Sequence, residues 1–136
     1  MRSGNDARAC RPAMSEGSGP MDVSFDSLTF EFAEFTVRPE SEAAMLAERE
    51  AMIQAQGRTF PGAIAAWLTR RDDGTWIDVI LWRSRREAEA AAARIHQVPE
   101  AGRWFRHIAE SRGVCHADVA HHAIFMANPP VAPPGS

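Results

Sequence analysis

Large apolar residues alternate with other residues in SLTFEFAEFTVRP, residues 27–39. A period of two predicts a β-strand with one buried face, and the proline marks its end. Two more apolar runs follow, GAIAAWLTR at 62–70 and TWIDVILWR at 75–83. They are joined by RDDG, whose Asp-Gly pair is typical of a hairpin turn. The pattern therefore predicts one strand and, further along the chain, a β-hairpin.

Helical spacing of apolar residues predicts a first helix within 39–57, with Ser41 as a candidate cap and Gly57 ending the run. Ser84 and Glu87 form the S-x-x-E capping box, so a second helix is expected to begin there. Its inner face is almost all alanine.

After Pro99 the spacing predicts another helical segment that runs to Gly113. Its expected buried stripe is Ala101, Trp104, Phe105, Ile108 and Arg112. The run GVCHADVAHHAIF, residues 113–125, is predicted to be the last strand.

The element order is thus strand, helix, strand, strand, helix, strand. This order predicts the ferredoxin-like βαββαβ fold of the α+β class, a four-stranded antiparallel sheet with helices on one face. We expect one such domain at 27–124. Residues 1–26 are rich in Gly, Ser, Pro and charge, and residues 125–136 are Pro-rich, so both ends are expected to be flexible tails.

The sheet is expected to need a partner on its uncovered face. Strand 75–83 is apolar on both faces, and AIAAWL at 63–68 has no polar face either. An exposed sheet of this kind would present several hundred Å² of apolar surface, which monomers seldom tolerate. A homodimer that packs sheet against sheet is the favoured prediction, and tails folded over the sheet are the alternative.

Composition limits the function classes. The formal net charge is −3, so we expect no binding to nucleic acid through many phosphate contacts. All 15 basic residues are arginines and there is no tyrosine, which excludes lysine and phenol chemistry. Cys10 and Cys115 do not make a disulfide framework. With neither a secretory signal nor a membrane span in the sequence, we expect a cytoplasmic location.

Several side chains are candidates for a site beneath the alanine helix. The alanines predict either a hollow lined by Trp and Met or a core in which Trp76 and Trp82 fill the space. Asp78, on the face of Trp76 and Trp82, is expected to be either a base or the partner of an arginine. Glu34 has the same two interpretations.

The predicted last strand places His116 and Asp118 on one face, where a carboxylate can fix the imidazole tautomer for proton abstraction. A structural hydrogen-bonded pair is the alternative, and a metal site with His122 is a third, although the spacing is not a zinc pattern. His107 is a second candidate base, whereas His96 at a helix end is expected to be structural.

The stretch VILWRSRREAEAAAARIHQVPEAGRWFRHI, in which a strand ends in Trp-x-Ser and enters a helix, resembles the dimeric α/β-barrel superfamily. Within it, residues 27–123 resemble the antibiotic biosynthesis monooxygenase family. The resemblance implies a pocket for a flat aromatic compound between sheet and helices. Haem-degrading relatives depend on an Asn in the first strand, a Trp and a His on the late helix. In this chain the Asn position is near Phe35 and the Trp position falls among Ala90–Ala92, so the triad is missing and haem breakdown by that route is not expected.

The resemblance implies a cofactor-independent monooxygenase that acts on a planar phenolic or polyketide-type substrate, with molecular oxygen as co-substrate and no metal. We expect His116, aided by Asp118, or else His107 as base, and Arg83 for the substrate anion. The expected substrate-binding residues are Trp67, Trp82, Trp104, Met52 and Asp78. The alternatives are a non-catalytic ligand-binding or accessory protein of the same fold and an oxygen-independent isomerase or cyclase.

Overall fold

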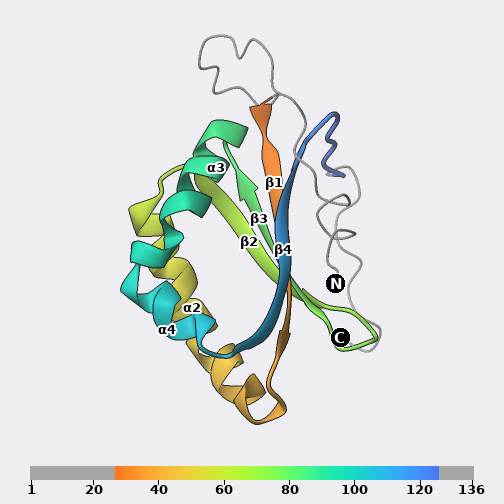
Figure 1. The fold of residues 1–136 in the computed structure, drawn as a ribbon. Coiled ribbons are helices and arrows are strands. Elements are labelled where there is room, and N and C mark those ends of the chain that lie inside the picture. Colours follow the sequence, from red (N-terminus) through yellow and green to blue (C-terminus); the bar gives the residue numbers. More distant parts are fainter. Residues whose placement is uncertain (1–26, 126–136) are drawn as a thin grey trace, which may run out of the picture.

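A computed structural model describes residues 27–125, and the predictions for residues 1–26 and 126–136 lie outside this range. The described chain forms a four-stranded antiparallel sheet in the order β2-β3-β1-β4. Figure 1 shows that the three α-helices lie together on one side of this sheet. The predicted ferredoxin-like α+β fold is confirmed.

The first half of the fold follows the predicted order. Strand β1 (Thr29–Val37) leads through a short 3-10 turn, η2 (Pro39–Ser41), into helix α2 (Glu42–Thr59). Gly57 lies inside this helix rather than at its end, and Ser41 caps it without a side-chain hydrogen bond. No helix among residues 27–125 has the length and apolar character needed to cross a membrane.

The predicted hairpin consists of β2 (Ala63–Arg70) and β3 (Trp76–Trp82). Gly74 in its turn has φ +93°, a conformation that a residue without Cβ adopts without strain. Helix α3 (Arg85–Arg94) then begins at the predicted cap, where the Ser84 hydroxyl accepts a hydrogen bond from the Glu87 backbone N–H at 3.2 Å.

Strand pairing decides which side chains face the helices. In β3, Trp76, Asp78, Ile80 and Trp82 are buried and alternate with half-buried residues. Opposite them in β1 lie Phe35, Ala33, Glu31 and Thr29. Because directly opposed residues share a face, Glu31 and Asp78 both point toward the helices. The other face carries Phe30, Phe32, Trp67, Ile77, Val79 and Leu81.

The core between the sheet and the helices combines large aromatic side chains with alanines. Trp82 and Trp104 are fully buried, and Met45 and Met52 of α2 pack in the same cluster. Ala88 and Ala91 of α3 are also fully buried. Trp82 and Trp76 therefore belong to the core, as one of the two sequence interpretations held, but they leave part of the space beneath α3 empty.

The predicted helix from Pro99 to Gly113 is wrong in its second half. After the 3-10 turn η3 (Ile95–Gln97), helix α4 spans only Pro99–Phe105, and β4 occupies Ile108–Asp118. Ile108 pairs with Val37 at the far end of β1, a contact that local spacing does not reveal. The predicted strand to residue 125 is also wrong, because β4 ends at Asp118 and His122 lies beyond it.

A bulge in β4 sets the direction of its last side chains. Ala33 pairs with Val114 and Phe35 with Ser111, so β4 has one more residue than β1 between these pairs. Gly113, with φ +108°, lies in this bulge, where the extra residue takes a conformation that suits glycine. From Val114 onward, alternate residues of β4 again face the helices, and His116 comes to lie opposite Glu31.

Candidate functional site

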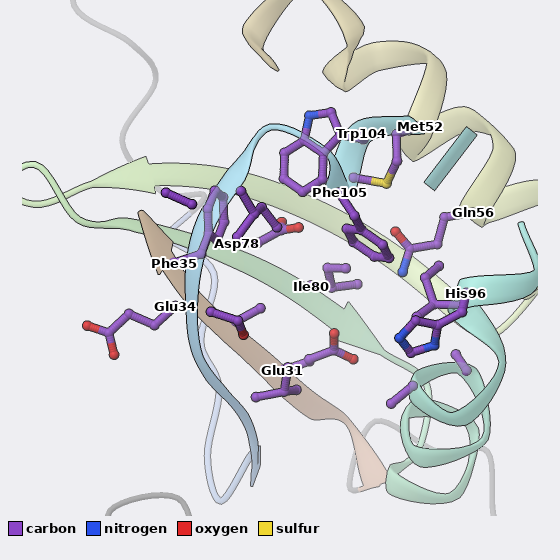
Figure 2. Close-up of a pocket in the computed structure, with 18 residues that line it drawn as sticks. Glu31, Glu34, Phe35, Met52, Gln56, Asp78, Ile80, His96, Trp104 and Phe105 are labelled. Atoms are coloured by element: carbon purple, nitrogen blue, oxygen red, sulfur yellow. The ribbon is translucent and has the colours of Figure 1, made fainter. Parts of the chain in front are cut away.

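A cavity of about 450 Å³ lies between the sheet and the helices. The sheet supplies its floor through β1, β3 and β4, and α2, α3, η3 and α4 supply its walls (Figure 2). A volume of this size is within the range of small-molecule sites. Its lining consists of Glu31, Ala33, Glu34, Phe35, Met52, Gln56, Asp78, Ile80, Ala91, Ala92, Ile95, His96, Trp104, Phe105, Ile108, Ala109, Ser111 and Val114.

Aromatic rings form one wall and are fixed in place. Trp104 packs edge-on against Phe35, with centroids 5.4 Å apart, and contacts Phe105 at 6.2 Å. Its indole N–H donates a hydrogen bond to the Met45 carbonyl at 3.0 Å, and the Arg49 guanidinium lies 5.4 Å from the ring centroid. Because these contacts hold the indole from several sides, the wall is formed before any ligand arrives.

The alanines of α3 keep the opposite wall open. Ala91 and Ala92 line the cavity, and no large side chain from α3 enters it. A cavity lined both by these small residues and by the rings of Trp104, Phe105 and Phe35 suits a planar apolar ring. The hollow predicted from the alanine pattern is therefore present.

Asp78 is held in the cavity wall by an ion pair. Arg49 Nη2 donates to its Oδ1 at 2.6 Å, and the two side chains are only 13% and 9% exposed. Burial raises the pKa of Asp78 above the ordinary value for a carboxyl, while the hydrogen bond and charge of Arg49 act to lower it. Of the two interpretations of Asp78, the arginine partner is the one the structure shows.

Glu31 is the second buried carboxylate of the cavity, and it has a different set of partners. The Trp82 indole N–H donates to Glu31 Oε1 at 3.1 Å. His116 Nε2 lies 3.5 Å from the same oxygen, and both side chains are 12% exposed. His116 Nε2 is buried and makes no hydrogen bond with any residue of the described range. Trp82, Glu31 and His116 thus form one cluster that reaches the cavity through Glu31.

Gln56 and His96 are further polar residues of the lining. Gln56 is buried on α2, whereas His96 is exposed and lies at the rim, 6.0 Å from the Phe105 ring centroid. Within residues 27–125, no group of three or more His, Cys, Asp or Glu side chains is arranged to hold a metal ion. The metal interpretation of His116, Asp118 and His122 is thereby corrected.

Several solved structures with the same architecture are described as antibiotic biosynthesis monooxygenases or candidates for that activity. A candidate antibiotic biosynthesis monooxygenase from Caulobacter crescentus CB15 matches with a TM-score of 0.56 at 15% identity, over 71% of this chain and 93% of that chain. Another, from Bordetella bronchiseptica, gives 0.55 at 18% identity, over 68% and 97%. The chain has the fold of antibiotic biosynthesis monooxygenases.

The fold is shared with one structure whose chemistry is stated. SnoaB, a cofactor-independent oxygenase from Streptomyces nogalater, matches with a TM-score of 0.51 at 18% identity, over 74% of this chain and 98% of that chain. No protein-family model matches the sequence, and no curated protein does. At these identities the matches establish the fold, and activity has to be argued from the cavity itself.

Three of the predicted substrate-binding residues line the cavity: Trp104, Met52 and Asp78. The other two do not. Trp67 lies on the opposite face of the sheet, 48% exposed and in contact with Phe30, because its position in β2 is opposite Val79. Trp82 is fully buried in the core and takes part only by holding Glu31.

The predicted catalytic residues are mostly engaged elsewhere. Asp118 Oδ1 accepts hydrogen bonds from Arg85 Nε at 3.0 Å and from Thr29 Oγ1 at 3.1 Å. Asp118 is therefore paired with these two residues and not with His116. His107 Nε2 lies 3.0 Å from Glu48 Oε1, and His107 is not part of the cavity lining.

Arg83 is likewise outside the cavity. It pairs with Glu87 on the surface, with 42% of its side chain exposed. The hydrogen bond from Arg83 holds the pKa of Glu87 below its usual range. Arg71 pairs with Glu34 in the same way, and Figure 2 shows Glu34 pointing away from the other labelled cavity residues. Neither Arg83 nor Arg71 lines the cavity.

Glu31 is the cavity residue that sequence reasoning missed. It alternates with Thr29, Ala33 and Phe35 on the helix-facing side of β1. The large rings of Phe30 and Phe32 favoured the opposite face of β1 as the buried one. The presence of Phe35, the last large residue before Pro39, on the side of Glu31 was the available signal.

Proposed function

We propose that this chain is a cofactor-independent, monooxygenase-like enzyme that acts on a planar phenolic or polyketide-type compound with dioxygen as co-substrate. The observation that carries the proposal is the cavity of about 450 Å³ between the fixed Trp104 wall and the alanines of α3. The shared fold with SnoaB, a cofactor-independent oxygenase, supports it by analogy.

The chemistry asked of the protein is limited. In such reactions the deprotonated substrate itself supplies an electron to dioxygen, so the protein has to exclude water, orient the ring and accept a proton. The cavity offers an apolar wall and buried polar groups for these tasks. The titratable side chains that line the cavity are carboxylates and one imidazole, so these groups are the candidate proton acceptors.

Oxygen uptake tests the proposal. Purified protein mixed with anthrones or naphthoquinols is expected to consume dioxygen faster than the compounds do alone, and Trp104 fluorescence should be quenched as the ring binds beside it. Quenching without oxygen uptake would favour a ligand-binding protein. Product formed under anaerobic conditions would favour an isomerase or cyclase.

We also propose that two copies pair through the uncovered face of the sheet. Phe30, Phe32 and Trp67 form an aromatic cluster there, with Phe30 5.9 Å from Phe32 and 6.3 Å from Trp67 between ring centroids. Half-buried aliphatic residues of β3 extend this apolar surface. Sedimentation at micromolar concentration should give about twice the 15.0 kDa mass of the chain, and single chains alone would contradict the pairing.

A further inference from the structure

Glu31 is a carboxylate fixed at the floor of the cavity with one oxygen still available. Both of its contacts, with Trp82 Nε1 at 3.1 Å and with His116 Nε2 at 3.5 Å, involve Oε1. Figure 2 shows the carboxylate extending into the cavity. Because Glu31 lies directly opposite Ile80 and His116 in the sheet, its position is set by the pairing of three strands. A ligand in the cavity would therefore meet Oε2.

The charged groups around Glu31 distinguish it from Asp78. Asp78, on β3, is already neutralised by Arg49 of α2 at 2.6 Å. His116 lies beside Glu31 on the neighbouring strand β4, and His96 of η3 lies at the rim of the cavity. Among the described residues that line the cavity there is no arginine. Glu31 is thus the buried carboxylate there that no fixed cation neutralises.

We propose that Glu31 is the proton acceptor of the cavity, that His116 is its positioning residue, and that the ligand is a planar aromatic compound that enters neutral with an acidic C–H or O–H bond. That bond breaks, its electron pair stays on the ligand, and the proton bonds to Glu31 Oε2. The negative charge moves from the carboxylate to the ring, so the total charge in the cavity does not change. This assignment rests on the function proposed above and names its base.

The lining also sets the charge of the ligand. An anionic compound such as an aromatic carboxylate would place its charge near Glu31 in a site without a lining arginine, and like charges repel strongly at low dielectric. A neutral compound avoids this cost. The expectation that Arg83 holds a substrate anion is replaced by selection of neutral ligands, because Arg83 is paired with Glu87 at the surface.

His116 acts through Glu31 rather than on the ligand. Its Nε2 is buried and has no hydrogen-bond partner within the described range, and Glu31 Oε1 is 3.5 Å away. The imidazole lies beside Oε1, the oxygen that already accepts the hydrogen bond from the Trp82 N–H at 3.1 Å, so Oε2 is the oxygen left for a ligand.

Exchange of the ring-methylene protons of anthrone in D₂O, followed by NMR without oxygen, measures the proton transfer alone. The wild-type protein is expected to accelerate this exchange, and Glu31→Gln should reduce the enzyme-catalysed rate by about 10²–10⁴-fold, the usual contribution of a positioned base. The same change at the exposed Glu110 of β4 is the control and should leave the rate unchanged. Exchange at the wild-type rate in Glu31→Gln would overturn the assignment, as would absence of catalysed exchange in the wild type.

A second variant guards against misfolding of the first. Glu31→Ala opens space for formate, which should restore part of the exchange rate if a carboxylate is what the site needs. Formate that has no effect on a folded Glu31→Ala protein would count against Glu31 as the base. The role of His116 is tested by His116→Phe, which keeps a ring beside Glu31 without a polar atom and should lower the exchange rate, and by His116→Gln, which keeps an N–H there and should restore part of the rate. Exchange at the wild-type rate in His116→Phe would overturn that role.

Proton exchange and oxygen uptake, measured on the same variants, distinguish the role of Glu31 as base from the proposed oxygenase function. Exchange that depends on Glu31 in a protein that takes up no oxygen would support the base and contradict the oxygenase. Oxygen uptake that Glu31→Gln leaves intact would support the oxygenase and contradict the base.

Discussion

Replacing Arg49 with methionine is expected to lower the free energy of unfolding by about 3–5 kcal/mol at neutral pH, the usual cost of leaving one partner of a buried ion pair unpaired. Asp78 would lose its 2.6 Å hydrogen bond while it stays buried beneath α2. The methionine keeps most of the packing of the arginine stem. Urea unfolding followed by circular dichroism measures the difference.

The loss should depend on pH in a defined direction. Burial already raises the pKa of Asp78, so the folded chain holds this proton more tightly than the unfolded chain does. Such a group costs stability once the pH rises above its unfolded pKa, and the cost grows until the pH passes its folded pKa. Without Arg49 the pKa rises further. The deficit of Arg49→Met should therefore be largest at neutral pH and shrink toward about pH 4, where an unfolded aspartate also takes up its proton.

Matched variants separate this effect from loss of a surface charge. Arg58, on the same helix, lies 3.9 Å from Glu100 with 67% of its side chain exposed, so Arg58→Met should change stability by less than about 1 kcal/mol. The double variant Arg49→Met/Asp78→Leu should recover most of the loss, because it removes the unpaired charge. Equal effects of Arg49→Met and Arg58→Met would contradict the role of the buried pair.

Replacing Ala92 with phenylalanine is expected to weaken binding of a planar ligand by roughly 100-fold, or about 2.7 kcal/mol. Ala92 is half-buried on α3 and lines the cavity, so the new ring would occupy the space meant for the ligand. Stability should change little, because the ring enters an empty volume rather than a packed core. Calorimetric titration with a hydroxyanthraquinone gives the affinities.

The neighbouring residue provides the control. Ala93 is exposed on the same helix, so Ala93→Phe adds the same ring outside the cavity and should bind the ligand as the wild type does. If Ala92→Phe binds as tightly as Ala93→Phe, the ligand does not occupy the space beneath α3.

The first three strands and the first two helices could be predicted because their signals are local. Strand β3 is a short apolar run bounded by the hairpin turn on one side and the helix cap on the other, a pattern typical of a buried strand. Ser84 and the Asp-Gly turn likewise act within a few residues. The predicted hollow beneath α3 also followed from local alanines, although only the structure shows that Trp82 and the hollow coexist.

The end of α4 could not be predicted because it depends on a distant partner. Ile108 and Arg112 fit a helical stripe and a strand equally well, and the pairing of Ile108 with Val37 decides in favour of β4. This pairing also fixes the site. His116 was expected to act with its neighbour Asp118, but the β1–β4 register puts Glu31 opposite His116 and brings Arg85 to Asp118.

A crystal structure of the chain with a bound hydroxyanthraquinone tests most directly whether the space between sheet and helices is the ligand site. The planar rings should lie between Trp104 and the alanines of α3, with a ligand oxygen within hydrogen-bond distance of Glu31 Oε2. A ligand bound instead against Trp67 on the other face of the sheet, or an interior closed by repacked side chains, would contradict this placement.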